Sequence, residues 1–195
     1  MSKGKTLITV NYVIDDGPRY SIDTLLYNIP DTALLQLVKA EHSEKIIKTG
    51  QPYSQDNLTK ERTRIDELLK DNGYFDFTRQ YIAYQVDSTV GEHKVKVQMS
   101  VVNPAQKASH KSFTIDSVSF VVERRPGTTK AKFAPFEYRN VTYKFANRYY
   151  SEKVLARRIH LMPGEVYSKS NTLNTQREIA GMDMYKFVNI NYDST

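Results

Sequence analysis

Hydrophobic and polar residues alternate in several short stretches of the chain, and this period-two pattern predicts half-buried β-strands. The first stretch covers residues 7–14 and has an apolar residue at every even-numbered position from Ile8 to Ile14. Turn-forming residues follow at 15–18, and a second strand is predicted over residues 20–29. Its apolar positions change phase in the middle, which predicts a β-bulge or partial burial of both faces.

Two helices are predicted after the second strand. Asp31 is a suitable N-cap for the first, whose apolar residues share one face. Ser54 is a suitable N-cap for a longer helix over about residues 54–72, which ends at Asn72-Gly73 because glycine adopts the left-handed conformation without steric cost. Within this helix, Asp66 and Lys70 form an i,i+4 pair of favourable polarity.

Two further strands, at residues 77–88 and 93–103, are predicted to form a hairpin with a turn at Gly91. In the second of them, apolar residues alternate strictly with polar ones, which is typical of a sheet with one buried and one solvated face. In the first, we expect a core-facing set at alternate positions. Its members are Ile82, Tyr84 and Val86.

The pattern then begins again, which predicts an internal repeat. Residues 113–120 match residues 20–27 position by position, including the phase change, and Gly164-Glu-Val-Tyr-Ser168 matches Gly50-Gln-Pro-Tyr-Ser54. The copies lie 93 residues apart at the strand and 114 apart at the glycine motif, so the second copy contains an insertion near residues 124–147. Each copy is predicted to be β-α-α-β-β, an α+β fold in which two helices cover a small mixed sheet.

This repeat divides the chain into three parts. Residues 1–16 are interpreted as the last strand of a preceding repeat, residues 17–104 as one complete domain, and residues 105–195 as a second domain that contains the insertion and lacks its last strand.

Charge is distributed unevenly between the two copies. Residues 105–160 hold 12 Lys/Arg and 4 Asp/Glu, whereas the rest of the chain holds 16 and 18. A basic segment favours a nucleic-acid or anionic-lipid partner, but these charges are scattered along the predicted strands rather than gathered in a block. Basic and aromatic residues also interleave over residues 133–150. This pattern suits a stacking platform for single-stranded nucleic acid, a contact patch for protein or lipid headgroups, or a hairpin whose aromatic side chains pack on its own sheet.

The residues that usually carry chemistry are dispersed. The four histidines, His42, His93, His110 and His160, have no partner at metal-ligand spacing, and the chain has no cysteine. Asp15-Asp16 stands in a turn, where aspartate is common for local hydrogen bonding. No nucleophile elbow or phosphate-binding glycine loop is present. We therefore expect no catalytic residue, no metal site and no cofactor.

The linked order of these motifs resembles the POTRA (polypeptide-transport-associated) domain. The matching pieces are Asp16-Gly17, the strand Tyr20–Tyr27, Gly50–Ser54 and Asn72-Gly-Tyr-Phe75. The second copy departs from the pattern, because Asp183-Met-Tyr-Lys-Phe187 has no glycine at the equivalent position. Arrays of such domains occur in BamA- and TamA-like outer-membrane assembly factors and in related surface-lipoprotein-like proteins.

The resemblance implies a function and a location. It implies domains on the periplasmic face of the outer membrane, in a protein whose barrel lies outside this chain, that bind unfolded outer-membrane proteins and accessory lipoproteins or periplasmic proteins by adding a strand to a sheet edge. Contact with lipid headgroups is a further option, and nucleic acid is not expected as a partner. A basic nucleic-acid-binding module, or a related domain of a secretion or cell-division protein, remains the alternative.

We place the predicted partner site on the strand at residues 77–88, which the resemblance puts at a sheet edge. The side chains opposite the core-facing set are Arg79, Tyr81, Ala83 and Gln85. We further expect the backbone N–H of Ala83 to point away from the sheet, toward an added strand.

Overall fold

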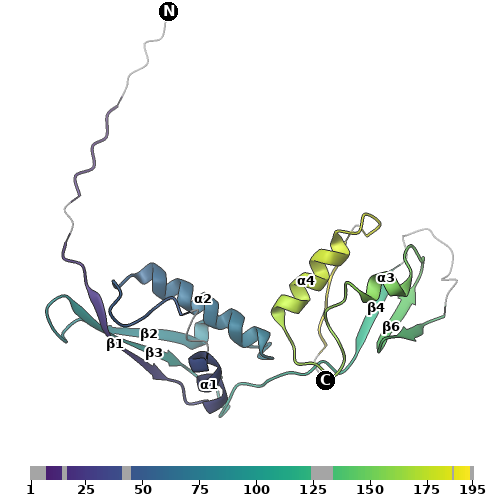
Figure 1. Ribbon diagram of the computed structural model, residues 1–195, viewed down its shortest axis with the longest axis horizontal. Coiled ribbons are helices and arrows are strands. Elements are labelled where there is room, and N and C mark those ends of the chain that lie inside the picture. The colour runs from purple at the N-terminus through teal and green to yellow at the C-terminus, as the bar shows by residue number, and fades with distance from the viewer. Residues whose placement is uncertain (1–7, 15–16, 41–44, 124–133, 186, 194–195) are drawn as a thin grey trace, which may run out of the picture.

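The computed structural model describes residues 8–14, 17–40, 45–123, 134–185 and 187–193, and Figure 1 shows two small sheets side by side, each with its own helices. We call residues 17–103 the first half and residues 113–193 the second half. Among the described residues, no helix is long and apolar enough to cross a membrane.

The first half contains a three-stranded mixed sheet and two α-helices. Its elements are β1 (Ser21–Asn28), α1 (Thr32–Ala40), α2 (Gln55–Asp71), the 3₁₀ turn η1 (Arg79–Tyr81), β2 (Ile82–Asp87) and β3 (Lys94–Val101). The strand order is β1-β3-β2, with β1 parallel and β2 antiparallel to β3. The pairing of β1 with β3 shifts register between Ile22 and Thr24, which confirms the predicted bulge.

Local capping explains where both helices begin. Asp31 Oδ1 accepts hydrogen bonds from the N–H groups of Ala33 and Leu34, and Ser54 Oγ accepts from Asn57 N–H, as the sequence predicts. The predicted pair in α2 also forms, because Lys70 Nζ lies 3.1 Å from Asp66 Oδ1. After α2, Gly73 has a φ of +96°, a conformation that costs glycine little.

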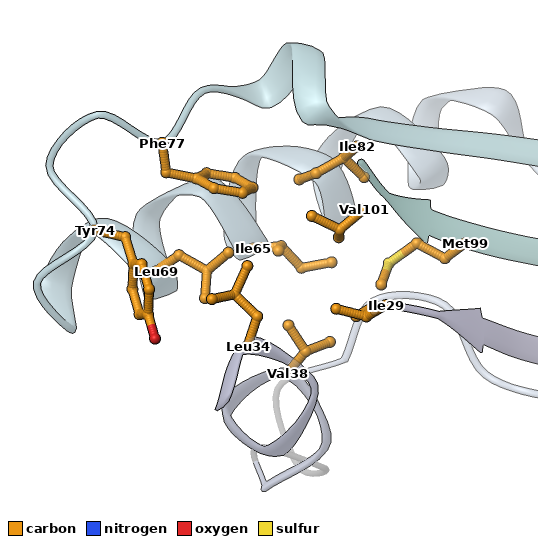
Figure 2. Packing of buried hydrophobic residues seen from close by; sticks show 10 residues of the cluster. All are labelled: Ile29, Leu34, Val38, Ile65, Leu69, Tyr74, Phe77, Ile82, Met99 and Val101. Carbon is orange, nitrogen blue, oxygen red and sulfur yellow. The ribbon is translucent and has the colours of Figure 1, made fainter. Parts of the chain in front are cut away.

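The core of the first half lies between the sheet and the two helices. Figure 2 shows side chains from α1, α2 and the ends of β2 and β3 meeting around Ile65 and Leu69, both fully buried. The alternation predicted for β3 is confirmed, because Val95, Val97, Met99 and Val101 are all at most 3% exposed. A second cluster around Ile22 and Ile47 continues the core toward the start of β1.

The second half also has a three-stranded mixed sheet and two helices, but its hairpin comes before the helices and not after them as in the first half. Its elements are β4 (Val118–Val122), β5 (Phe136–Tyr138), β6 (Val141–Phe145), α3 (Glu152–Ala156) and α4 (Lys169–Ala180). The strand order is β4-β6-β5, with β4 parallel and β5 antiparallel to β6. The hairpin β5–β6 lies within the predicted insertion near residues 124–147, of which residues 124–133 fall outside the described residues.

Hydrogen bonds at equivalent positions support the repeat. Ile22 exchanges backbone hydrogen bonds of 2.8 and 2.7 Å with Gln51 and Gly50, and Ile115 exchanges bonds of 2.8 and 2.7 Å with Glu165 and Gly164. Gly50 and Gly164 share a left-handed φ of +83° and +86°. Ser168 caps α4 through Asn171 N–H as Ser54 caps α2. The α+β fold with two helices over each small sheet is therefore confirmed.

Two predicted strands differ from the structure. Residues 8–14 form no strand among the described residues, and Ile8, Val13 and Ile14 are more than 80% exposed, because no described strand lies beside them. The strand predicted from residue 77 starts only at Ile82. Residues 79–81 form the turn η1 instead, because the ring of Tyr81 packs against Phe77 and His110 rather than pointing to solvent.

Candidate partner-binding edge

Strand β2 lies at the edge of the first sheet. It pairs with β3 alone, from Ile82 opposite Val101 to Asp87 opposite Lys96. An edge strand presents backbone donors and acceptors at fixed spacing, so it can pair with another extended chain. The predicted location of the partner site on an edge strand thus has the required geometry.

The structure divides the four predicted site residues into two groups. Ala83 and Gln85 lie in β2 with exposed side chains, as expected. Arg79 and Tyr81 lie in η1, outside the strand. Arg79 is exposed and donates from Nη1 to Thr63 Oγ1 at 3.4 Å, whereas Tyr81 is half-buried against the core. Tyr81 therefore does not share a face with Ala83 and Gln85.

The direction of the backbone groups along β2 is opposite to the one expected. Val102 N–H donates to Tyr81 O at 2.9 Å, and Ile82 faces Val101 in the register. In an antiparallel ladder, this bond makes Ile82–Val101 a pair without mutual hydrogen bonds and Ala83–Ser100 a hydrogen-bonded pair. Ala83 N–H therefore points to β3. The N–H groups of Tyr84 and Val86 point outward.

The residues of β2 whose N–H groups point outward are thus the same residues whose side chains face the core. Ile82 is 3% exposed, Tyr84 is half-buried and Val86 is 39% exposed, so burial decreases toward the end of the strand. The guanidinium of Arg62 in α2 lies 5.4 Å from the centre of the Tyr84 ring. Burial raises the pKa of the Tyr84 hydroxyl above its ordinary value, so this side chain stays neutral at the edge.

Residues that join the two halves were not predicted from the sequence. Asp71 at the end of α2 accepts three hydrogen bonds at the start of α4, from Ser168 Oγ, Ser170 N and Ser170 Oγ at 3.0, 2.7 and 2.6 Å. Beside it, Phe113 N–H donates to Gly73 O at 2.8 Å. The ring of Phe75 contacts Phe113, Tyr167 and Tyr192, with centroids 5.0–6.0 Å apart. We call this contact the joint.

The other candidate residues have structural surroundings. His110 is buried, with Nε2 3.2 Å from Val102 O, and its backbone N–H donates to Asp31 Oδ2 at 3.2 Å. His160 Nε2 lies 2.9 Å from Glu178 Oε1 at the surface. His42 and Asp15-Asp16 lie outside the described residues. Within the described part of the chain, no group of three or more His, Cys, Asp or Glu side chains is placed to hold a metal ion.

The aromatic residues of the insertion pack into the second core. Phe136 stacks on Tyr143 with centroids 5.5 Å apart, and Tyr143 is fully buried. Phe145 is 3% exposed in the same cluster. These rings are therefore not available as a stacking platform, and the interpretation of a hairpin packed on its own sheet is the one that the structure supports.

Comparison with known proteins finds a matching family model and solved structures of similar fold. The POTRA family model, described as a surface antigen variable number repeat, matches residues 27–103. A structure of BamA from Haemophilus ducreyi lacking POTRA domains 1–3 aligns over 87% of this chain and 25% of its own length, with 16% identity and a TM-score of 0.52. No curated relative is found by sequence similarity.

Two further solved structures align less closely. POTRA domains 3–5 of Haemophilus influenzae BamA align over 87% of this chain and 53% of their own length, with 10% identity and a TM-score of 0.46. POTRA domains 1–2 of the periplasmic domain of Omp85 from Anabaena align over 84% and 78%, with 11% identity and a TM-score of 0.40. The chain thus spans about half of the Haemophilus influenzae BamA structure and a quarter of the Haemophilus ducreyi one.

The fold is that of a small α+β module, and it resembles the BamA structure from Haemophilus ducreyi. Residues 27–103, in the first half of the chain, match the POTRA family model.

Proposed function

We propose that this chain is a periplasmic binding scaffold for the assembly of outer-membrane β-barrel proteins, and that it has no enzymatic activity. The family match in the first half supports the scaffold role. The single observation that carries the binding mode is the unpaired outer edge of β2. The proposed partners are unfolded outer-membrane proteins and accessory lipoproteins or periplasmic proteins.

The physical case rests on backbone pairing. Alternate residues of β2 direct their N–H and C=O groups outward, and the strand ends in exposed residues from Gln85 onward. A client strand would be held mainly by main-chain hydrogen bonds, so many client sequences fit the same edge. Such tolerance suits a domain that handles different barrel strands.

Proline substitution at neighbouring positions tests this edge. Val86→Pro removes an outward N–H and leaves the ladder to β3 intact, and proline is tolerated on edge strands at such positions. The matched control is Gln85→Pro, which removes an N–H that points to Gln98 of β3 and should destabilise the hairpin. The probe is a peptide carrying one strand of an outer-membrane barrel, measured by calorimetry, with folding followed by circular dichroism.

We expect Val86→Pro to stay folded and to lose measurable peptide binding. A folded Val86→Pro variant that binds as well as the parent chain would exclude the β2 edge. Replacement of the exposed side chain in Gln85→Ala should leave binding within about twofold, because the side chain contributes no main-chain hydrogen bond.

We also propose the domain organisation that the repeat predicts. Residues 1–16 belong to the last strand of a preceding repeat, residues 17–104 form one POTRA-type domain and residues 105–195 form a second. The exposed apolar residues of the segment 8–14 support the first assignment, because such a strand requires a sheet to cover it. Deleting residues 1–16 should leave the unfolding of the remaining chain unchanged. A loss of stability after the deletion would show that residues 1–16 pack on the sheet of the first half.

A nucleic-acid role has a separate test. The basic segment of the second half contributes only scattered charges, so binding should be weak and should vanish near physiological salt. Binding of duplex or single-stranded nucleic acid can be measured by fluorescence anisotropy at about 200 mM salt. A sub-micromolar dissociation constant under that condition would favour the alternative of a nucleic-acid-binding module.

A further inference from the structure

The 3₁₀ turn η1 occupies one of the backbone groups on the outer edge of β2. Ile82 N–H points away from β3 and donates to Arg79 O. Arg79 is itself attached to α2, because its Nη1 donates to Thr63 Oγ1 at 3.4 Å. Tyr81 N–H closes the turn on Thr78 O at 3.1 Å. The outer edge of β2 is therefore not uniform, since its first donor is already used.

The other end of this edge is closed by the turn that leads to β3. Asp87, the last residue of β2, accepts at Oδ1 from Thr89 N–H at 2.9 Å and from Thr89 Oγ1 at 2.7 Å. Between the two ends, the outward groups are the N–H groups of Tyr84 and Val86 and the C=O groups of Ile82, Tyr84 and Val86, none of which bonds to another described residue. The edge thus has more free acceptors than free donors.

A strand that runs parallel to β2 matches this set of groups. In a parallel ladder, one residue bonds to the two positions that flank the residue opposite to it. The partner residue opposite Ala83 would donate to Ile82 O and accept from Tyr84 N–H. The partner residue opposite Gln85 would donate to Tyr84 O and accept from Val86 N–H. The parallel ladder therefore begins at the first free group and does not need Ile82 N–H.

An antiparallel strand conflicts with η1 at the same point. In an antiparallel ladder, a hydrogen-bonded pair exchanges both of its bonds. The partner residue opposite Ile82 would direct its own C=O at Ile82 N–H, where Arg79 O already lies. Such a strand must leave the edge after Tyr84 and forgo the bond to Ile82 O. Parallel pairing is slightly less stable per residue, but over so short an edge the additional bond outweighs this difference.

The side chains of β2 determine what the partner carries at alternate positions. On the helix side of the sheet, Tyr84 is half-buried and Val86 is 39% exposed, so an added strand would cover the exposed part of both. The Arg62 guanidinium holds the Tyr84 ring on this side, 5.4 Å from its centre. Ala83 and Gln85 on the opposite face are exposed. Apolar residues of the partner therefore fit the helix side, and polar residues fit the solvent side.

We propose that the β2 edge takes an amphipathic extended segment in the parallel direction, with η1 as the boundary that fixes its register. The first residue to pair lies opposite Ala83, and the chain that precedes it turns away at η1. Apolar side chains lie opposite Tyr84 and Val86. Barrel strands alternate apolar and polar residues with this period, so a transmembrane strand is the partner that fits. This inference rests on the proposed binding at β2 and adds its direction, register and sequence class.

Amide exchange measures the boundary on the protein. The probe is a synthetic barrel-strand peptide with blocked ends, added to the whole chain, and hydrogen exchange is followed by NMR. We expect the amides of Tyr84 and Val86 to exchange rapidly in the free chain and to gain about tenfold protection or more with saturating peptide. The Ile82 amide should be protected in both states, because Arg79 O holds it. Rapid exchange at Ile82 in the free chain, followed by protection with peptide, would overturn the role of η1.

Spin labels at the two ends of the peptide measure its direction. The chain has no cysteine, so a label carried on a cysteine of the peptide stays on the peptide. A parallel strand places the N-terminal label beside η1, where it should broaden the amide signals of Arg79 and Tyr81. The C-terminal label should broaden those of Ser88 and Thr89 instead. The reverse pattern would show an antiparallel strand and overturn the proposal.

Peptide variants test the sequence class and the boundary. A peptide of the same composition with its alternation abolished should bind about tenfold more weakly in calorimetry, because side chains on alternate positions give an added strand its specificity. Extending the original peptide at its N-terminus with further alternating residues should change the dissociation constant by less than about twofold, because η1 leaves no further group to pair. Equal binding of the two compositions, or a clear gain from the extension, would contradict the proposal.

The outcomes separate this proposal from the proposed function. If peptide binds but the Tyr84 and Val86 amides gain no protection, the β2 edge is not the site and the proposed binding mode fails as well. If these amides gain protection while the labels report the antiparallel direction, binding at β2 stands and only the direction and register proposed here fail.

Discussion

Buried polar side chains hold the loops of the first half to its helices. Glu61 in α2 is 1% exposed, accepts a hydrogen bond from Ile46 N–H at 2.8 Å and lies 2.7 Å from Arg64 Nη2. His110 is 9% exposed and connects the segment before the second half to Val102 and Asp31. Burying such polar groups is costly unless they are hydrogen-bonded.

The pH dependence of stability follows from His110. Burial lowers the pKa of its imidazole below the ordinary value, so the folded state favours the neutral ring. The contribution to stability is therefore present above the unfolded pKa of about 6.5 and is lost as the pH falls through the folded pKa, by about 1.4 kcal/mol for each unit between the two values. Urea unfolding at pH 7.5 and 5.0 measures this loss.

The control for this prediction is His110→Gln, which cannot titrate. It should be less stable than the parent at pH 7.5, and its stability should fall less between the two pH values. Equal pH dependence in the two chains would show that another group is responsible.

Whereas His110→Gln should lower stability, removing the hydroxyl of Tyr143 should not. Its side chain is fully buried, and its hydroxyl has no hydrogen-bond partner among the described residues. Removing an unsatisfied buried hydroxyl should be neutral or stabilising, so Tyr143→Phe should change the free energy of unfolding by between 0 and about +1 kcal/mol. Tyr143→Ala should cost about 3–5 kcal/mol, because it leaves a cavity between Phe120, Phe136 and Phe145. A clear loss of stability in Tyr143→Phe would contradict this assignment.

At the scale of elements, the two helix caps look alike in sequence and differ in structure. Ser54 Oγ only accepts from Asn57 N–H, at 3.4 Å, whereas Ser168 Oγ accepts from Asn171 N–H and also donates to Asp71 Oδ1. Ser54→Ala should cost about 1 kcal/mol. Ser168→Ala should cost more, because it also breaks a hydrogen bond to a carboxylate, which contributes about 1.5–3 kcal/mol.

A double-mutant cycle separates these two effects. Ser168→Ala combined with Asp71→Ala should show a coupling energy of about 0.5–3 kcal/mol, and Ser54→Ala combined with Asp71→Ala should be additive within about 0.5 kcal/mol. The measurement is chemical denaturation of the three single variants, the two double variants and the parent. Additivity at both serines would mean that Asp71 does not hold α4.

Local patterns predicted most of the elements, and contacts between distant residues explain the rest. The alternation in β3 and the caps at Asp31, Ser54 and Ser168 depend on neighbours within four positions, so the sequence displays them. The start of β2 was predicted too early because Tyr81 packs on His110, a contact that no short window contains.

The predictions for the candidate site divide in the same way between local patterns and contacts of distant residues. The strand that carries the candidate site lies at a sheet edge, as predicted, because the motif order predicted a terminal hairpin strand. The direction of Ala83 N–H could not be predicted, since it depends on which pairs of the β2–β3 ladder are hydrogen-bonded. The parallel pairing of β6 with β4 likewise depends on tertiary contacts, which the insertion alone does not specify.

At the scale of the molecule, the described contacts between the two halves include the joint and an ion pair beside it, in which Lys169 Nζ lies 3.5 Å from Glu67 Oε1. The first core lies under α1 and α2 and the second under α3 and α4, and Figure 1 shows the chain crossing between them as a single connection. The contacts at the joint involve Asp71, Gly73 and Phe75, which all follow or end α2. This short stretch therefore sets how the edge of β2 is oriented relative to the second sheet.

Gly73 lies close against the second half and the segment that leads to it. A methyl group added there would lie 2.5 Å from Val166 Cγ1 and closer still to Ser112 Oγ, both in the second half or the segment that leads to it. Gly50 is a matched control, because its φ of +83° resembles the +96° of Gly73 but nothing lies within 4 Å of an added methyl group. Both substitutions to alanine strain the backbone by about 1–2 kcal/mol, and only Gly73→Ala also pushes against the other half.

Distances between the halves therefore distinguish the two variants. The chain has no cysteine, so spin labels can be attached at Glu92→Cys and Lys144→Cys, two exposed positions in different halves. We expect Gly73→Ala to shift or broaden the distance distribution measured by pulsed electron paramagnetic resonance, because the joint must open to admit the methyl group. Gly50→Ala should reproduce the parent distribution while losing similar local stability. If Gly73→Ala also reproduced it, the contact at Gly73 would not determine how the two halves are arranged.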